Sequence, residues 1–394
     1  MNDDECFNSY EDLKEDLPNR YLPPQIIGKL IPENTYAFEI IGKSFESRPI
    51  YKLTFGKGPI KLLFVGQIHG NETTATRAMF DLWKLLHLDE TRFESLAEKV
   101  EISFIPQLNP DGAYYFTRRN HSNIDINRDF IANQTPEMKA FKEDINHENY
   151  DYIFTLHDQR TIFHPDNSPK PSTLSFLAPV TGKDVIEIPF QRMKAIQLIG
   201  CMIQGVRDYL PAQISRFSDE YYPKAIGDNL QKLGFPSVLI ECGHYPGDYN
   251  RNQTRKFTCF AILSALDAIV YDKHLENNSF IYNNIPVNSQ KYLDIIYRDV
   301  KIENSQNYSM VDIGIQYEEV LENLHEISFR AKIVEIGDLS DYYGHDIYHA
   351  ENRVFKNNID TIPKIGQFAE FNLGDWSIIN GKPIELNINE FRVT

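Results

Sequence analysis

The chain of 394 residues is strongly acidic, with 56 Asp and Glu against 40 Lys and Arg and a formal net charge of −16 at pH 7. Nucleic acids and anionic membrane surfaces are therefore not expected as partners, because both are bound through clustered Lys and Arg. Apolar residues make up 42% of the chain, which is enough for a large core, and the length allows two domains.

The N-terminal residues and the cysteines predict the compartment. The opening segment MNDDECFNSYEDLKEDLP is acidic and polar, without the basic and apolar regions of a secretory signal. No apolar run approaches the roughly 20 residues that cross a bilayer. The cysteines are widely spaced without a CxxC motif, which argues against a disulfide framework and a cysteine zinc site: Cys6, Cys201, Cys242 and Cys259. We expect a soluble cytoplasmic protein and make no prediction of its oligomeric state.

Strand and helix patterns alternate up to residue 275. Near-continuous apolar runs predict strands at 61–67, 101–106, 151–156, 173–180 and 236–241. Longer periodic segments predict helices at 73–88, 189–209 and 257–275. This alternation predicts an α/β domain with a mixed, largely parallel central sheet covered by helices on both faces.

The pattern changes near residue 276, where the polar, turn-rich segment 276–290 predicts a linker. Short alternating stretches follow at 292–302, 326–336 and 383–393, separated by Gly- and Asn-rich breaks. These predict a small C-terminal all-β domain. The expected domains are therefore a catalytic domain over 1–275 and a β-rich accessory domain over 276–394.

Polar side chains of the kinds that bind metals follow two of the predicted strands. His69 and Glu72 lie in the turn after the strand at 61–67, and His157 follows the strand at 151–156. Ligands of open α/β sheets bind at this carboxyl edge. Two imidazoles and a carboxylate would form a His₂Glu site that leaves one position for water, as in catalytic zinc centres. Alone, His157 could instead be a hydrogen-bonded histidine, and Asp158 either orients a ligand or faces solvent.

Two further groups of polar residues have a chemical interpretation and a structural one. Glu241 ends the strand at 236–241 and is either a charged residue at a strand end or a general base. The segment 109–130 opens with an Asn-Pro-Asp-Gly turn and then concentrates Arg118, Arg119, Asn127 and Arg128. The structural interpretation is a solvated basic loop. In an acidic protein, however, such a concentration of arginines suggests binding of a carboxylate or an oxyanion, since guanidinium groups bind both.

Taken in order, these motifs resemble the zinc carboxypeptidase family, the carboxypeptidase A-like metallopeptidases, over about residues 40–275. The segment IIGKSFESRPIYKLTFGKG resembles the family's G-x-S-x-x-x-R-P-I lead-in. HGNE, the NPDG turn, the R…DxNRxF loop, the late histidine and the strand-borne glutamate follow in the family's order.

The resemblance implies a site that binds one Zn²⁺ per chain through three side chains: His69, Glu72 and His157. Glu241 would be the general base, which activates water and then protonates the leaving amine. Arg118 would stabilise the oxyanion, because it lies ten residues before Arg128, with Arg119 as a close competitor for that role.

The resemblance also implies how a substrate is held. Asn127 and Arg128 match the pair that binds the substrate's C-terminal carboxylate. Tyr221 and Tyr222 both lie where the family has a mobile tyrosine, and the sequence does not decide between them. The expected function is therefore zinc-dependent hydrolysis of the C-terminal peptide bond of a peptide, and the expected partner is a peptide or amino-acid-derived substrate with a free carboxylate.

Some features depart from the family and leave alternatives open. Asp158, Gln159 and Arg160 follow the third ligand, where the family usually has a small residue, so Arg160 is a candidate substrate contact. Asn71 stands where pancreatic-type members have Arg. The appended β-domain is shared with N-acyl amino acid amidohydrolases of the aspartoacylase and succinylglutamate desuccinylase type, and a muropeptide amidase is a third possibility. A catalytically inactive scaffold would leave a role vacant, and none is vacant.

Overall fold

The computed structural model describes residues 7–8, 10–14, 16–17, 20–30, 37–183, 187–271, 278–357 and 361–384. The chain divides into two compact units. The first comprises Met1–Gln159 and Pro165–Asn288, and the second comprises Arg160–His164 and Ser289–Thr394. The boundary expected between residues 275 and 276 lies outside the described residues and stays a prediction.

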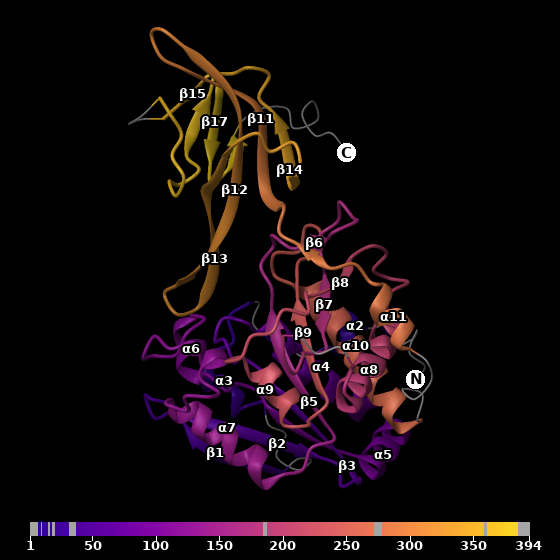
Figure 1. Ribbon diagram of the computed structural model, residues 1–394. Helices are drawn as coiled ribbons and strands as arrows, with labels where there is room; N and C mark the ends of the chain where they lie inside the picture. Colours follow the sequence, from indigo (N-terminus) through magenta and orange to yellow (C-terminus); the bar gives the residue numbers. More distant parts are fainter. Residues whose placement is uncertain are drawn as a thin grey trace. The chain divides into compact units, whose positions relative to one another are not determined.

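An eight-stranded mixed sheet forms the centre of the first unit within the described residues (Figure 1). In spatial order its strands are β1 (Ala37–Lys43), β2 (Pro49–Phe55), β4 (Val100–Ile105), β3 (Ile60–Val65), β5 (Tyr152–Asp158), β9 (Ser237–Cys242), β7 (Leu174–Leu177) and β8 (Ile214–Arg216). The pairs β3–β4, β3–β5, β5–β9 and β7–β8 are parallel, whereas β1–β2, β2–β4 and β7–β9 are antiparallel. The predicted mixed, largely parallel sheet is confirmed.

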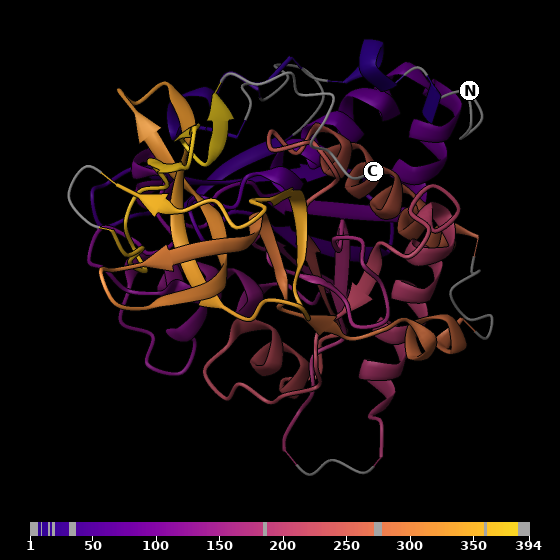
Figure 2. The ribbon, with the colours of Figure 1, turned by 90° about the horizontal axis from the view of Figure 1, so that it is seen from above.

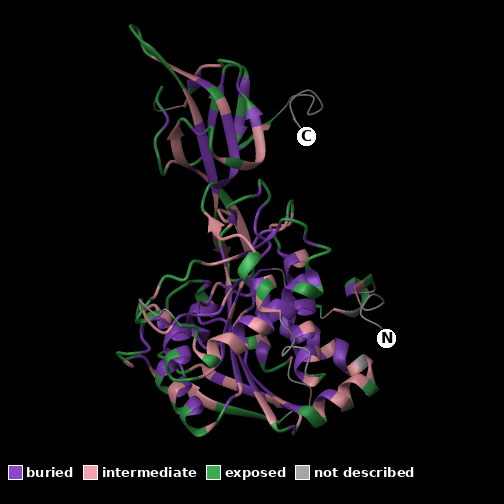
Figure 3. Cartoon of the chain, turned by 45° about the vertical axis from the view of Figure 1, so that its right-hand side comes forward, coloured by how far each residue is buried: buried purple, intermediate pink, exposed green. Residues whose placement is uncertain are grey.

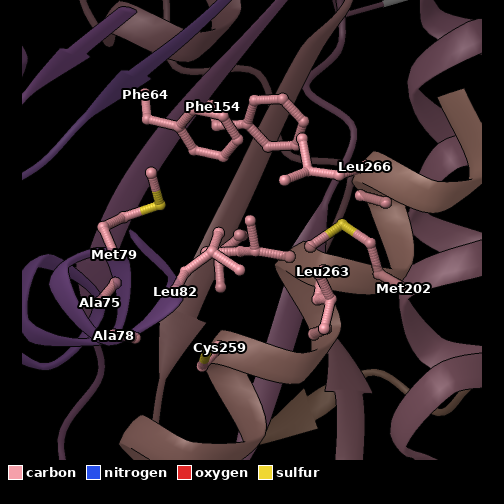
Figure 4. Packing of buried hydrophobic residues seen from close by; sticks show 14 of the residues in the cluster. Phe64, Ala75, Ala78, Met79, Leu82, Phe154, Met202, Cys259, Leu263 and Leu266 are labelled. Atoms are coloured by element: carbon pink, nitrogen blue, oxygen red, sulfur yellow. The ribbon is translucent and has the colours of Figure 1, made fainter. Parts of the chain in front are cut away.

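Helices cover both faces of this sheet. The larger core lies against α4 (Thr74–Leu88), α5 (Glu90–Lys99), α8 (Phe190–Val206), α10 (Asn252–Val270) and α11 (Ser279–Asn284). Figure 4 shows part of it, where Phe64 and Phe154 from adjacent strands stack with ring centroids 4.2 Å apart. Leu82, Met202 and Leu263 from three different helices pack beside them.

The opposite face is covered by α7 (Pro136–His147) and α9 (Ile226–Lys232). Alternation along β3 explains the continuous apolar run in its sequence. Leu62 and Phe64 belong to the larger core, whereas Leu63 and Val65 belong to the core under α7 and α9. Because successive side chains of a strand point to opposite faces, a strand buried on both sides needs apolar residues at every position. In Figure 3 the interior of this unit is drawn largely in purple, the colour of buried residues.

The remaining short elements of the first unit connect or flank the sheet. They are α2 (Tyr10–Leu13), α3 (Pro24–Ile27), α6 (Pro110–Tyr115) and a 3₁₀ turn at Ile126–Arg128. Two short strands lie where the units join in sequence, β6 (His164–Pro165) and β10 (Asn288–Ser289).

The predicted linker at 276–290 is partly helical. Within it, α11 buries Tyr282, whose hydroxyl oxygen accepts a hydrogen bond from the Ala178 N–H at 3.2 Å. Residues 279–288 therefore belong to the first unit. The helix predicted at 257–275 begins earlier, at Asn252. The apolar pattern did not reveal its first turn, because the residues there are polar. Residues 272–275 lie outside the described residues.

The second unit is all-β in its described residues, and Figure 2 shows its strands in orange and yellow. One sheet has the order β13 (Glu326–Gly337), β12 (Tyr308–Glu322), β11 (Tyr292–Glu303) and β14 (Tyr343–His349). The other comprises β15 (Phe355–Lys356), β16 (Phe371–Leu373), β17 (Trp376–Ile379) and β18 (Lys382–Ile384). Both contribute to one core, which includes Ile315 from β12 and Trp376 from β17. The strands predicted at 292–302 and 326–336 are confirmed, while most of 383–393 lies outside the described residues.

Across the described ranges, no helix is long and apolar enough to cross a membrane. The cytoplasmic location stays a prediction.

Candidate metal centre

The turn after β3 carries two of the predicted ligands, His69 and Glu72, and buries both of them. The Glu72 N–H donates to the His69 carbonyl at 3.1 Å and closes this turn. Gly70, between the two ligands, packs directly on the NPDG turn, since a Cβ at Gly70 would lie 1.9 Å from the Gly112 carbonyl carbon. A side chain at position 70 would push the two turns apart, so glycine is required by close approach of backbones.

The third predicted ligand, His157, lies near the end of β5 beside the turn. Its Nδ1 lies 2.9 Å from Glu72 Oε2 and 3.2 Å from His69 Nδ1, and His69 Nδ1 lies 2.8 Å from Glu72 Oε1. One ligand atom from each side chain therefore lies within 4.8 Å of the others, and all three residues are buried. Two imidazole nitrogens and one carboxylate are the donor set of catalytic zinc sites, so these residues fit the ion that the sequence predicts.

A carboxylate that the sequence interpretation did not single out, Asp125, orients the first histidine. Asp125 Oδ1 lies 3.2 Å from His69 Nε2, a contact that favours a ring proton on Nε2, and Nδ1 faces the other ligands. The Asp125 side chain also accepts from Arg118 at 3.1 Å. Its position within DxNRxF, two residues before Asn127, was the available signal.

Burial and the neighbouring charges shift the pKa values of the three proposed ligands. Burial acts to lower the pKa of His69, but Glu72 and Asp125 raise it above its usual value. Burial would raise the pKa of Glu72, yet the two histidines hold it well below its usual range. Burial lowers the pKa of His157. The ionised carboxylate is the form in which Glu72 would bind a cation, whereas His69 would have to lose any second ring proton when the ion binds.

Glu241 lies on β9, the strand next to β5, and its register partner on β5 is His157. Burial raises the pKa of Glu241 well above its usual value, and Glu72 and Asp158 raise it further. The predicted base is therefore half-buried and lies beside the ligand cluster.

The structure distinguishes the two candidate arginines by position. Arg118 Nη1 lies 3.2 Å from His69 Nδ1 and 3.3 Å from Glu72 Oε1. Arg119 instead donates to the Asn123 carbonyl within its own loop at 2.9 Å. Arg118, about half exposed, is therefore the arginine that reaches the ligand cluster.

The predicted carboxylate-binding pair lies on the 3₁₀ turn at 126–128. Asn127 Oδ1 accepts from the Ile226 N–H at the start of α9 at 3.0 Å, which orients the amide and leaves Nδ2 to donate. Arg128 is exposed, and its guanidinium lies 5.5 Å from the centre of the Tyr222 ring. The Tyr222 hydroxyl donates to Glu220 at 2.8 Å, while Tyr221 is half-buried. This arrangement does not choose between the two tyrosines.

The G-x-S-x-x-x-R-P-I lead-in supports the site from outside it. Ser44 Oγ and Arg48 Nη1 each donate to Asp111 Oδ1 at 2.6 Å, and the Glu46 N–H donates to Asp111 Oδ2 at 2.9 Å. Asp111 belongs to the NPDG turn, on which Gly70 packs. The lead-in therefore fastens the β1–β2 hairpin to the turn that supports the metal ligands.

Two of the three residues that follow His157, Asp158 and Gln159, make buried hydrogen bonds within the fold. The Asp158 carboxylate accepts from Thr74 Oγ1 at 2.7 Å and lies 3.5 Å from Arg20, with a side chain that is 3% exposed. Of the two alternatives for Asp158, solvent exposure is excluded. Gln159 is also buried and donates to the Ser172 carbonyl at 2.9 Å, whereas Arg160 is exposed.

Asp228 on α9 gives a pH-dependent prediction. Burial raises the pKa of this carboxyl to about 6, so its contribution to stability is present below about pH 4 and is lost as the pH rises through 6. Asp228→Asn should therefore increase the free energy of unfolding by about 1 to 2 kcal/mol at pH 8, with no gain at pH 4. Denaturant titrations between pH 4 and 8 measure the difference. A variant less stable than wild type at pH 8 would show that the carboxylate is ionised and well paired.

The chain is similar to zinc carboxypeptidases over part of its length, both in sequence and in fold. Residues 30–161 match the family model described as zinc carboxypeptidase, and the resemblance predicted from the motifs is confirmed. This range contains the three predicted ligands together with Arg118, Asn127 and Arg128, whereas Glu241 lies beyond it.

Individual relatives share parts of the chain. Carboxypeptidase 2 of Trichophyton tonsurans is 33% identical over 84 residues, which cover 21% of this chain and 16% of that protein. The chain thus aligns with about a sixth of the length of that curated relative. A metallo-carboxypeptidase from Burkholderia cenocepacia has a similar fold with a TM-score of 0.51 at 17% identity, covering 63% of this chain and 68% of that one. Thrombin-activatable fibrinolysis inhibitor gives a TM-score of 0.52 at 13% identity, covering 69% and 82%.

Proposed function

We propose that this chain is a zinc metallocarboxypeptidase that hydrolyses the C-terminal peptide bond of a peptide. The observation that carries this proposal is the convergence of His69, Glu72 and His157, whose ligand atoms lie within 4.8 Å of one another. The family match over residues 30–161 supports the same activity.

The reaction would use residues on two neighbouring strands and one loop. Zinc held by the three ligands would supply Lewis-acid polarisation of the scissile carbonyl and would lower the pKa of water. Glu241, facing His157 across β5 and β9, would take the proton from water and deliver it to the leaving amine. Partial burial raises its pKa, whereas a bound cation would lower it. Together these effects would let the ionised carboxylate take a proton from water and hold it until the amine leaves.

Arg118 and Arg128 would have different roles in the reaction. Arg118, within 3.3 Å of the ligand side chains, would donate to the oxyanion that forms on the carbonyl. Asn127 and Arg128 would bind the substrate's terminal carboxylate, the asparagine through its Nδ2 and the arginine through its exposed guanidinium. Recognition of that carboxylate would restrict cleavage to the last residue of the peptide.

A substrate panel tests the proposal by mass spectrometry. The panel combines peptides with basic, acidic and apolar C-terminal residues, the same peptides with amidated C-termini, muropeptides and N-acyl amino acids. Zinc-dependent release of one C-terminal residue from the free-acid peptides, with little release from the amidated ones, is expected because only the former carry the carboxylate. Release of an acyl group from N-acyl amino acids, or cleavage of muropeptides alone, would replace the proposal with one of the alternative amidase functions.

A further inference from the structure

Gln67 adopts an unusual conformation directly before the metal-ligand turn. Its φ is +40° and its side chain is fully buried, two residues before His69. Left-handed backbone is uncommon for residues other than glycine and persists only where surrounding contacts enforce it. We therefore expect hydrogen bonds of the Gln67 side chain and backbone to hold it in this conformation.

The Gln67 amide group links the turn to the neighbouring loop. Gln67 Nε2 donates to the Gly70 carbonyl at 2.7 Å, and Gln67 Oε1 accepts from Gln107 Nε2 at 2.9 Å. Gln107 Nε2 also donates to the Leu22 carbonyl at 2.8 Å. Gly70 lies between His69 and Glu72, so the first of these hydrogen bonds fixes the Gly70–Asn71 peptide within the segment that joins the two ligands.

The backbone on both sides of the amide pair is fixed as well. The Leu108 N–H donates to the Gly66 carbonyl at 3.1 Å, and the Asn109 N–H donates to the Gln67 carbonyl at 3.0 Å. These bonds hold the start of the turn against the chain that follows β4. The Gln67 side chain then fixes its far end at Gly70.

We propose that Gln67 and Gln107 form a buried amide bridge that positions the metal-ligand turn. Both are positioning residues, since they act on His69 and Glu72 through the Gly70 peptide and do not themselves contact the ligand atoms. Leu22, which anchors the bridge, lies outside the range of the family match, so this support is additional to the shared motifs. The inference rests on the proposed function only in that zinc is the ion bound.

The test is zinc affinity, measured by competition with a chromophoric chelator on the full chain. Gln67→Glu is nearly isosteric and retains an oxygen toward Gln107, but a carboxylate cannot donate to the Gly70 carbonyl. Gln107→Ala removes the other half of the bridge. Each should weaken zinc binding roughly 10-fold to 100-fold, the range found when side chains supporting metal ligands are removed. Substituted Co²⁺ should show an altered visible spectrum in both variants, because the ligand geometry changes.

Two controls separate positioning from general stability. Gln231→Ala removes another buried amide, which accepts from the Ser237 N–H at 3.1 Å at the far end of β9, and should leave zinc affinity unchanged. Gln67→Gly relieves the positive φ yet removes the bridge, so it should bind zinc as weakly as Gln67→Glu even if it is more stable to heat.

The outcomes distinguish the two proposals. If wild type binds zinc and Gln67→Glu, Gln67→Gly and Gln107→Ala bind it equally tightly with an unchanged cobalt spectrum, the amide bridge has no positioning role and only this inference fails. A wild-type chain that binds no zinc would overturn the proposed function together with the inference.

Discussion

Replacing Glu241 with glutamine should lower kcat by roughly 100-fold to 10,000-fold, the usual contribution of a positioned general base, while one zinc ion per chain remains bound. The glutamine keeps the size of the side chain beside His157 but cannot accept a proton from water. Because Glu241 is not among the three ligands, the metal should be retained. Steady-state kinetics on the best peptide of the panel, together with zinc content by plasma mass spectrometry, measure both effects.

Glu148→Gln is a matched control, since Glu148 pairs with Lys61 at 2.7 Å and takes no part in the ligand cluster. This variant should retain near-normal turnover. Near-normal turnover of Glu241→Gln would instead show that another group removes the proton, and loss of zinc from that variant would place Glu241 among the ligands.

Replacing His157 with alanine should remove both zinc and activity. The substitution takes one of three donors from a buried cluster and removes one of the partners of Glu72, the imidazole at 2.9 Å from its Oε2. Loss of a direct ligand should exceed the roughly 100-fold weakening caused by changes in supporting side chains, so zinc should be lost on dialysis. Turnover should fall to background, since polarisation of the carbonyl depends on the ion.

His147→Ala provides the comparison, because this exposed histidine lies in the last turn of α7. It should bind zinc and turn over as wild type does. Wild type stripped with a chelator should lose activity and regain it with added zinc, whereas His157→Ala should not regain it. Retention of stoichiometric zinc by His157→Ala would refute the proposed ligand set.

The sequence predicts most of the first unit where burial is strong. Leu62 to Val65 are buried on both faces, and such segments show as continuous apolar runs. By contrast, β1 lies at the sheet edge and exposes Phe38 and Ile40, so it shows no alternation that a pattern could reveal. The short helix α11 is hidden because only Tyr282 of its residues is fully buried within a polar segment.

The proximity of the three proposed metal ligands could be predicted from the arrangement of the strands. His69, Glu72 and His157 follow strands, and the sheet brings strand ends together, so their proximity follows from topology. Asp125 and Gln67 act through the orientation of other side chains, which depends on folded geometry. Asp125 at least lies within the DxNRxF motif, whereas no sequence pattern marks Gln67, because its hydrogen bonds form only in the folded chain.

The ligands and the base are separated along the chain in a way that matters during synthesis. His69 and His157 are 88 positions apart and meet only when β3 and β5 pair, so no short early fragment can hold the ion. Glu241 lies on β9, which is made later and adds to the sheet beside β5. A growing chain that has exposed β5 but not yet β9 would present every proposed ligand without the proposed base, so metal capture would become possible before peptide hydrolysis.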